Sequence, residues 1–455
     1  MGKVKQPRKG KKFPVKRTEA FKIPAGFYAL LPLVVTALFF IPVAGFDVLN
    51  WDDGEYLTNI PLLKDFSLYR LFTLFWMGNY HPLTMLLFTA GMKIAGANGT
   101  FFHLLSLAFH LLNVYLVYRV VMELTGKNKL VAMLTALLFG IHPMHIGSVT
   151  WISELKDMSY AAFFLLSLFA YLRYAARGKW TLYAASLLLF LLSCLCKGQA
   201  VVLAPVIILA DILKKRKFTL PVIAEKIPFL ALALCFGLLA MKAQQSVSAL
   251  SFGMVKTHEN YLFAFYNYAV YLLKAVYPWG LAPVHPYPAL STTVLLAIMG
   301  LFLALAAASV WVARKTGPLT VFGLLFFAVT LSIVAKFIPV GEESIAERYT
   351  YIPYIGLFLL MAMAFARLLK NPRYRIAGAV ILAAYLTGLL IRGYGYLGTY
   401  RNSETYWQNE ISVHPGFWRP YYNLCKYYGE TGQPEKALEM NTRAIDLIPS
   451  DYRSE

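Results

Sequence analysis

Residues 27–56 read FYALLPLVVTALFFIPVAGFDVLNWDDGEY. The part from 27 to 46 has no charged side chain, and one helix needs about 20 apolar residues to cross a bilayer. The pair Asp52-Asp53 follows where such a helix would leave the membrane. Acidic side chains are costly at the end of a membrane span, so those that stay there are often functional. They suit a base that deprotonates a hydroxyl or a ligand of a cation; the alternative is a solvated loop that caps the next helix.

The composition of the whole chain indicates an integral membrane protein. Hydrophobic residues make up 58% of the 455 residues, charged residues make up 15%, and the mean hydropathy is +0.56. The net charge of +20 would suggest a nucleic-acid partner for a soluble protein, but the basic residues here cluster in short breaks between apolar runs. We therefore expect no nucleic-acid partner. The four cysteines show no CxxC spacing, which indicates neither a zinc site nor a disulfide framework.

The apolar runs predict about eleven transmembrane helices. Residues 1–26 form a basic tail that stays in the cytoplasm under the positive-inside rule. The run 262–280 contains Lys274 and ends in Pro278-Trp279-Gly280, which suits a re-entrant or interfacial helix on the outer face. With that assignment the basic breaks fall on the cytoplasmic side and the C-terminus lies outside. The predicted spans are 27–46, 101–122, 129–146, 158–176, 181–196, 199–213, 227–243, 293–312, 318–336, 350–369 and 376–394.

Three segments on the predicted outer face are candidates for chemistry. The first is the loop 47–100, whose part 82–94 is apolar enough to lie along the membrane surface. The other two are 142–157 and 337–349. Each contains charged or histidine side chains at the predicted end of a span, which is where intramembrane chemistry at the outer surface would be placed.

Residues 400–455 are polar and amphipathic, unlike the rest of the chain. The part 418–451 fits one tetratricopeptide repeat, a helix-turn-helix unit, in a single register. One repeat cannot bury both of its faces, so it must pack on residues 400–417, on the membrane part, or on another chain. On the outer side it indicates either a docking surface for a protein or peptide, or a structural cap. The residues that fit the repeat pattern are Tyr421, Leu424, Tyr428, Gly432, Ala437, Ala444 and Pro449.

Four short motifs occur in order along the predicted outer face: Trp51-Asp52-Asp53, His81-Pro82-Leu83-Thr84, His142-Pro143-Met144-His145 and Ala346-Glu347-Arg348-Tyr349-Thr350-Tyr351-Ile352-Pro353. With the repeat, this order resembles the transmembrane and tetratricopeptide-repeat O-mannosyltransferases and, more broadly, the GT-C glycosyltransferases. Two features depart from that family. There is one repeat instead of many, and Ser153-Glu154-Leu155-Lys156-Asp157 replaces a Gly-Arg-Ala-Asp-like stretch. The single repeat and the basic tail indicate a prokaryotic relative, whose sugar and acceptor the resemblance does not specify.

The resemblance implies an all-α polytopic membrane protein of the GT-C type. Its catalytic domain would cover 27–399, and a tetratricopeptide-like helical hairpin would occupy 400–455 on the outer face. The implied reaction transfers a sugar from a polyprenyl-phosphate donor to an acceptor, a protein hydroxyl, on the outer (periplasmic or extracytoplasmic) face of a bacterial-type inner membrane. The alternatives are a GT-C transferase that modifies a lipid or cell-surface polysaccharide, and a non-enzymatic transporter or assembly scaffold. No P-loop or Gly-rich dinucleotide motif is present in the sequence.

The resemblance also assigns catalytic and phosphate-binding residues. The family's catalytic acid corresponds to Asp52 or Asp53; adjacency alone does not choose, and the match to the leading acid favours Asp52 narrowly. The leaving phosphate needs fixed cations, for which Arg348 is the best candidate because its guanidinium can bind phosphate with two hydrogen bonds. Lys156 and His142 are further candidates. The alternatives are an ordinary Glu347-Arg348 ion pair and a Lys156 side chain that extends to the membrane interface.

The substrate-binding candidates are His81, Glu154, Asp157, Glu347 and Tyr349. The alternative for His81 is a cap on the helix that starts at Pro82. His142 and His145 have the i, i+3 spacing that places two imidazoles on one helical face, so a divalent cation (Mg²⁺ or Mn²⁺) held by His145, Asp157 and Asp53 is a further hypothesis. The competing interpretation is that these histidines donate hydrogen bonds to phosphate or sugar. Aromatic residues near the acids can stack on sugar rings or form the interfacial belt; they are Trp51, Tyr56, Trp76, Tyr80 and Tyr349.

Overall fold

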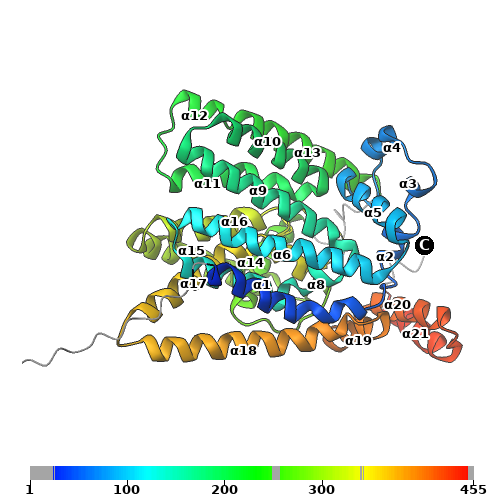
Figure 1. The fold of residues 1–455 in the computed structure, drawn as a ribbon. Coiled ribbons are helices and arrows are strands. Elements are labelled where there is room, and N and C mark those ends of the chain that lie inside the picture. The colour runs from blue at the N-terminus through cyan, green and yellow to red at the C-terminus, as the bar shows by residue number, and fades with distance from the viewer. Residues whose placement is uncertain (1–23, 25, 248–256, 339–340, 342, 449–455) are drawn as a thin grey trace, which may run out of the picture.

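The computed structural model describes residues 24, 26–247, 257–338, 341 and 343–448, most of which are helical. Long helices lie side by side and form the body of the molecule, and the helices of residues 53–95 and 403–447 lie at one end of it (Figure 1). The long helices and their close neighbours are α1 (Phe27–Phe40), α6 (Gly99–Leu124), α7 (Lys129–Ile141), α8 (Ile146–Thr150), α9 (Leu155–Arg177), α10 (Trp180–Cys196), α11 (Leu203–Leu213), α12 (Leu220–Ala224), α13 (Ile227–Gln245), α14 (Thr257–Val276), α15 (Thr292–Thr316), α16 (Pro318–Leu331), α17 (Tyr354–Lys370) and α18 (Arg375–Thr399).

Six helical segments among the described residues are long and apolar enough to cross a membrane. A seventh results if α7 and the segment Pro143–Thr150 count as one span, although the two are bent by 58° at the break. Proline at 143 lacks the N–H that would continue the helix and disfavours helical backbone at His142, which explains the break. The six segments are Phe27–Gly45, Gly99–Leu124, Ile152–Arg177, Leu220–Gln245, Thr292–Thr316 and Arg375–Thr399.

Each of the eleven predicted spans contains a helix, but not each helix has the length of a span. The helices α10, α11, α16 and α17 have 17, 11, 14 and 17 residues. The predicted span 129–146 is corrected, because α7 ends at Ile141. The structure therefore confirms a mostly helical integral membrane protein with six or seven candidate spans. The count of eleven, and the interfacial position of 262–280 (mostly in α14), stay predictions.

Helix α9 is the best-covered of the long helices, and its start carries several candidate site residues. It packs along α10 and α6. Small polar residues let α10 approach closely: the Ser167 hydroxyl donates to the Ser186 carbonyl at 2.6 Å, and the Ser193 hydroxyl donates to the Tyr160 carbonyl at 2.8 Å. The position of Glu154, Lys156 and Asp157 is thus fixed by hydrogen bonds further along the same helix.

The outer loop and the C-terminal region lie at the same end of the molecule (Figure 1). The loop folds into α2 (Asp53–Leu57), α3 (Pro61–Lys64), α4 (Leu68–Thr73) and α5 (Pro82–Ala95). The C-terminal region folds into α19 (Ser403–Val413), α20 (Trp418–Glu430) and α21 (Pro434–Leu447), with α20 packed on both of the others.

Asn50 joins the outer loop to the C-terminal helices through three hydrogen bonds, one of which its backbone N–H donates to the Ser403 hydroxyl at 2.9 Å. The Asn50 amide donates to the Asn423 carbonyl at 2.9 Å, and the Trp407 indole N–H donates to the Asn50 side-chain oxygen at 2.8 Å. Trp407 is fully buried. The C-terminal helices are therefore attached to the loop that carries Asp52 and Asp53.

A short two-stranded sheet orders the third outer segment. Strand β1 (His285–Pro286) pairs antiparallel with β2 (Glu343–Ile345), with His285 opposite Ile345. A 3₁₀ turn, Glu347–Thr350, follows β2 and leads into α17. The strand, the turn and the helix together set the direction of the Arg348 side chain.

We predict that Gly356→Ala destabilises the protein. A Cβ on Gly356 would collide with the Gly323 carbonyl oxygen and lie 3.1 Å from the Phe327 nitrogen, so α16 and α17 would have to separate. Overpacking of this kind costs about 1–3 kcal/mol. Thermal unfolding in detergent should show a lower midpoint for this variant. Gly395→Ala in α18 is the control, because nothing lies within 4 Å of the added Cβ; an equal loss in both variants would contradict the packing argument.

Candidate functional site

A cavity of about 840 Å³ opens where the outer loop, the start of α9, helix α13 and the segment 332–349 meet. Its lining has two chemical characters. Apolar side chains come mainly from α13 and from 333–338, including Leu234, Leu238, Met241, Ile333, Val334 and Ile338. Charged side chains come from the other elements and from Lys336: Asp52, Glu154, Lys156, Lys197, Lys336, Glu343, Arg348 and Arg419. The cavity can therefore hold a molecule with an anionic head and an apolar tail.

The two adjacent aspartates face different surroundings. Asp52 lines the cavity, whereas Asp53 is fully buried and does not. Burial raises the pKa of Asp52 above the usual range of an aspartate, and the nearby cations Lys156, Arg348 and Arg419 oppose that rise. A raised pKa makes the Asp52 carboxylate a stronger base than an exposed aspartate.

Asp53 holds the outer loop against the start of α9. One carboxylate oxygen accepts hydrogen bonds from the Ser153 backbone N–H at 2.8 Å and from the Ser153 hydroxyl. The other accepts from the Leu49 backbone N–H at 3.1 Å. Burial raises the pKa of Asp53 to about 6 even though these three bonds favour the carboxylate. Its contacts are those of a positioning residue.

Glu154 is the centre of a cluster of cations. Its carboxylate lies 3.4 Å from the Lys156 ammonium and 3.3 Å from the Lys197 ammonium. The Arg348 Nε lies 3.3 Å from the same carboxylate. Glu154 is 1% exposed, so these pairs are screened little by solvent. The carboxylate thus holds three cations from three separate elements at one wall of the cavity.

A second buried acid extends this cluster. Arg348 also reaches Glu343, with an N–O distance of 3.6 Å, and Lys336 lies 3.6 Å from the same carboxylate. These two cations hold the pKa of Glu343 below its usual range although burial would raise it. Arg348 therefore bridges two carboxylates, which fixes its guanidinium at the cavity lining.

Asp157 and Glu347 lie behind the lining. Asp157 pairs with Lys197 and accepts a hydrogen bond from the Ser148 hydroxyl at 3.2 Å. Glu347 accepts from the Ala282 backbone N–H at 2.9 Å and lies 3.8 Å from the Lys274 ammonium. Neither side chain lines the cavity. Asp157 orients Lys197, which does line it, whereas the partners of Glu347 lie away from the lining.

Aromatic rings enclose the charged part of the cavity. Trp51 stacks on Trp151 with ring centroids 4.4 Å apart and an angle of 15° between the planes. The Arg348 guanidinium lies 5.4 Å from the Trp151 ring and 4.9 Å from the Tyr349 ring. The Tyr349 hydroxyl donates to Glu343 at 2.9 Å. Such rings can contact a sugar, and they also limit the movement of the Arg348 guanidinium.

The histidines lie away from the cavity. His81 is 2% exposed and neither ring nitrogen has a hydrogen-bond partner among the described residues. Burial lowers the pKa of His81 to about 3, so its imidazole is neutral. The alternative role as a cap on α5 is not observed, because the side chain makes no capping bond. His142 and His145 are buried beside Tyr354 and Phe358.

The proposed metal ligands do not converge. Within the described part of the chain, no three His, Cys, Asp or Glu side chains are close enough to hold one ion. His145 bonds through Nδ1 to the Phe139 carbonyl at 2.8 Å, while Asp53 and Asp157 bond to the partners given above. The set His145, Asp157 and Asp53 is therefore corrected: the turn at Pro143 buries His145 in the aromatic core.

Sequence reasoning missed several residues of the lining, among them Trp151, Lys197, Lys336, Glu343 and Arg419. The signal for the two lysines was their isolation: each is the only charged residue of a long apolar stretch, at the predicted outer end of a span. Their partners lie far away in the sequence, so the spacing could not identify them.

Comparisons with known proteins confirm the resemblance to O-mannosyltransferases. Residues 80–243 match the family model described as dolichyl-phosphate-mannose-protein mannosyltransferase. A protein O-mannosyl-transferase of Caenorhabditis elegans is 24% identical over 88% of this chain and 60% of its own length. Human protein O-mannosyl-transferase TMTC4 is 22% identical over 79% of this chain and 57% of its own. The chain thus spans somewhat more than half of the length of these two relatives.

A comparison with solved structures also gives a similarity to one membrane protein. It is the crystal structure of ArnT from Cupriavidus metallidurans bound to undecaprenyl phosphate. The match has 16% sequence identity and a TM-score of 0.47, and it covers 93% of this chain and 76% of the other.

We predict that Arg348→Ala weakens binding of an amphiphilic phosphate to the cavity roughly 10- to 100-fold, because a hydrogen bond to a charged group contributes about 1.5–3 kcal/mol. Arg348→Lys should restore only part of the loss, since an ammonium cannot bridge Glu154 and Glu343 as the planar fork does. Binding of a long-chain alkyl phosphate would be measured for both variants in detergent. Arg373→Ala, at an exposed turn between α17 and α18, is the control; an unchanged Arg348→Ala protein would contradict the assignment.

Proposed function

We propose that this protein transfers a sugar from a polyprenyl-phosphate donor to the hydroxyl of a protein acceptor on the outer face of the membrane. The observation that carries the proposal is the cavity itself. It joins an apolar wall from α13 and 333–338 to fixed cations at Lys156, Lys336 and Arg348, with the Asp52 carboxylate in the same lining. A lipid tail, a phosphate and an acceptor hydroxyl each have a chemically matching partner there. The sequence relatives named as protein O-mannosyl-transferases support the same reaction class.

In the proposed reaction, Asp52 acts on the acceptor and the cations act on the phosphate. Asp52 takes the proton of the acceptor hydroxyl, whose oxygen then bonds to the anomeric carbon of the sugar. The bond between that carbon and the phosphate oxygen breaks, and the electron pair leaves with the phosphate. Negative charge grows on the phosphate during this step, and Arg348, Lys156 and Lys336 stabilise it. Tyr349 and Trp151 contact the sugar between the two centres.

The buried acids organise this arrangement without touching the reacting atoms. Asp53 fixes the outer loop to Ser153 and so directs Asp52 into the cavity. Glu154 gathers Lys156, Lys197 and Arg348, and without it these cations would repel one another. The geometry thus favours Asp52 as the base and gives Asp53 a positioning role.

The proposal includes a topology. Eleven spans, a cytoplasmic tail over 1–26 and an outer C-terminus would put the cavity and helices α19–α21 on the outer face of a bacterial-type inner membrane. The attachment of α19 and α20 to the outer loop through Asn50 supports placing them on the same face. There the tetratricopeptide-like hairpin would dock a protein acceptor, as the names of the relatives suggest.

We predict that Asp52→Asn lowers sugar transfer roughly 10²- to 10⁴-fold, the usual effect of removing a general base. The variant should still bind undecaprenyl phosphate, since the cations stay in place. Transfer from a polyprenyl-phosphate sugar to Ser- or Thr-containing peptides would be followed with purified protein in nanodiscs. For the wild type, kcat/KM should fall as the pH drops through the raised pKa of Asp52, because protonation removes the base.

Two further variants make this test specific. Asp53→Asn should reduce transfer by disordering the loop, and it should also lower thermal stability. Asp52→Asn should reduce transfer but leave thermal stability unchanged. Asp65→Asn, an exposed acid of the same loop, is the control that should leave transfer unchanged. Full transfer by both Asp52→Asn and Asp53→Asn would refute the catalytic assignment.

A further inference from the structure

Helix α20 of the C-terminal region contributes a side chain to the cavity. Arg419, in its first turn, lines the same cavity as Asp52 and Arg348. The residue belongs to the segment 400–455, whose polar and amphipathic sequence differs from the apolar sequence of the rest of the chain. Its charge acts on Asp52, where it opposes the effect of burial together with Lys156 and Arg348. The C-terminal helices therefore form a wall of the site rather than a detached module.

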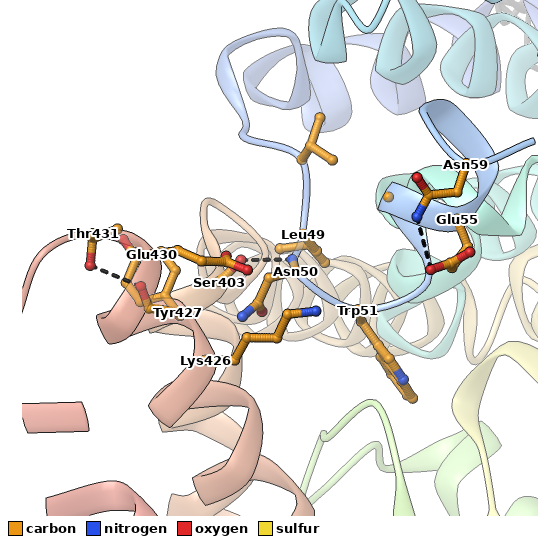
Figure 2. A pocket seen from close by; sticks show the side chains of 12 residues that line it. Leu49, Asn50, Trp51, Glu55, Asn59, Ser403, Lys426, Tyr427, Glu430 and Thr431 are labelled. Atoms are coloured by element: carbon orange, nitrogen blue, oxygen red, sulfur yellow. Dashed lines mark hydrogen bonds between the residues drawn. The ribbon is translucent and has the colours of Figure 1, made fainter. Parts of the chain in front are cut away.

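A second, smaller cavity lies on the other side of Trp51. It has a volume of about 350 Å³ and is formed between residues 48–59 of the outer loop and helices α19 and α20. Trp51 lines both cavities. Figure 2 shows Lys426 extending from α20 toward Trp51, with Glu55 and Asn59 on the loop opposite.

One face of α20 contributes side chains to both cavities. Arg419, Asn423, Lys426 and Glu430 follow one another at intervals of four, three and four residues, which places them along one side of a helix. Arg419 lines the larger cavity, Lys426 and Glu430 line the smaller one, and the Asn423 carbonyl between them accepts the bond from Asn50. This polar face of α20 therefore runs from the smaller cavity to the neighbourhood of Asp52.

We propose that the α20 side chains in the two cavities, Lys426 and Glu430 in the smaller one and Arg419 in the larger one, bind a peptide acceptor. Arg419 contacts this acceptor beside Asp52. The inference rests on the proposed transfer reaction and adds the residue that recognises the acceptor. The donor's cations are already held by Glu154 and Glu343, whereas Arg419 comes from the opposite, C-terminal side. The smaller cavity is lined mainly by polar side chains of both charges and by amides, which suit a peptide backbone better than a lipid tail.

The experiment compares the full-length wild type with Arg419→Ala and Arg419→Lys in nanodiscs. Arg419→Ala should raise the KM for a Ser/Thr peptide about tenfold or more, the effect of losing one charge-assisted hydrogen bond. Affinity for undecaprenyl phosphate should change less than about twofold. Arg419→Lys should recover part of the peptide affinity. Arg443→Ala, an exposed arginine of α21, is the matched control and should behave as wild type.

A pH profile separates the effect of the Arg419 charge on Asp52 from a merely structural role, while the KM for the peptide reports contact with the acceptor. Asp52 is faced by Lys156, Glu154, Arg348 and Arg419. Loss of the Arg419 charge should therefore move the acid limb of kcat/KM to higher pH, and Arg419→Lys should leave it in place. A structural defect would lower the rate at every pH without moving the limb.

The outcomes distinguish this inference from the function on which it rests. A wild type that transfers sugar to no acceptor refutes the proposed function. A wild type that glycosylates peptides while Arg419→Ala keeps the wild-type KM and pH profile refutes the role of Arg419 alone. Transfer to a lipid or glycan but not to peptides would overturn the peptide acceptor. Equal losses of donor and peptide affinity would assign Arg419 to the donor instead.

Discussion

The ion cluster around Glu154 is the interaction on which the rest of the site depends. A carboxylate that is 1% exposed at the edge of a membrane span would be prohibitively costly alone, and it is stable here because Lys156, Lys197 and Arg348 surround it. The same contacts bring the start of α9, the turn after α10 and the segment after β2 to one place. The contacts that compensate the Glu154 charge therefore also assemble the cavity, and they orient the three cations at its wall.

The helices were largely predictable from the sequence, because a bilayer satisfies no backbone hydrogen bonds and forces each long apolar run to be helical. The break at His142 was not predicted, since the apolar run continues through it while Pro143 ends the helix. Short helices such as α11 and α16 lie in apolar runs that predict spans, although the helices themselves have only 11 and 14 residues. The length of an apolar run in the sequence therefore does not give the length of the helix that forms there.

For the site, five residues that the sequence selected, namely Asp52, Glu154, Lys156, Arg348 and Tyr349, line one cavity. The sequence could not tell the roles of Asp52 and Asp53 apart, because the position of Asp53 depends on a hydrogen bond from Ser153, 100 residues away. Nor could it separate a histidine near an outer loop from one buried under Tyr354 and Phe358. Lys197 and Lys336 looked like isolated charges because their partners are set only by tertiary packing.

The position of Trp51 between the two cavities has a consequence for how the solvent acts on each side. Lys156, Lys197 and Lys336 are nearly inaccessible, so mobile ions screen their fields weakly. Lys426 and Glu430 are exposed, and their fields decay within roughly 10 Å at an ionic strength of about 0.1 M. Ionic strength therefore affects the electrostatic field in the smaller cavity far more than in the larger one, although Trp51 lines both. The protein can hold one charged molecule firmly in changing salt while the affinity for a second varies with its surroundings.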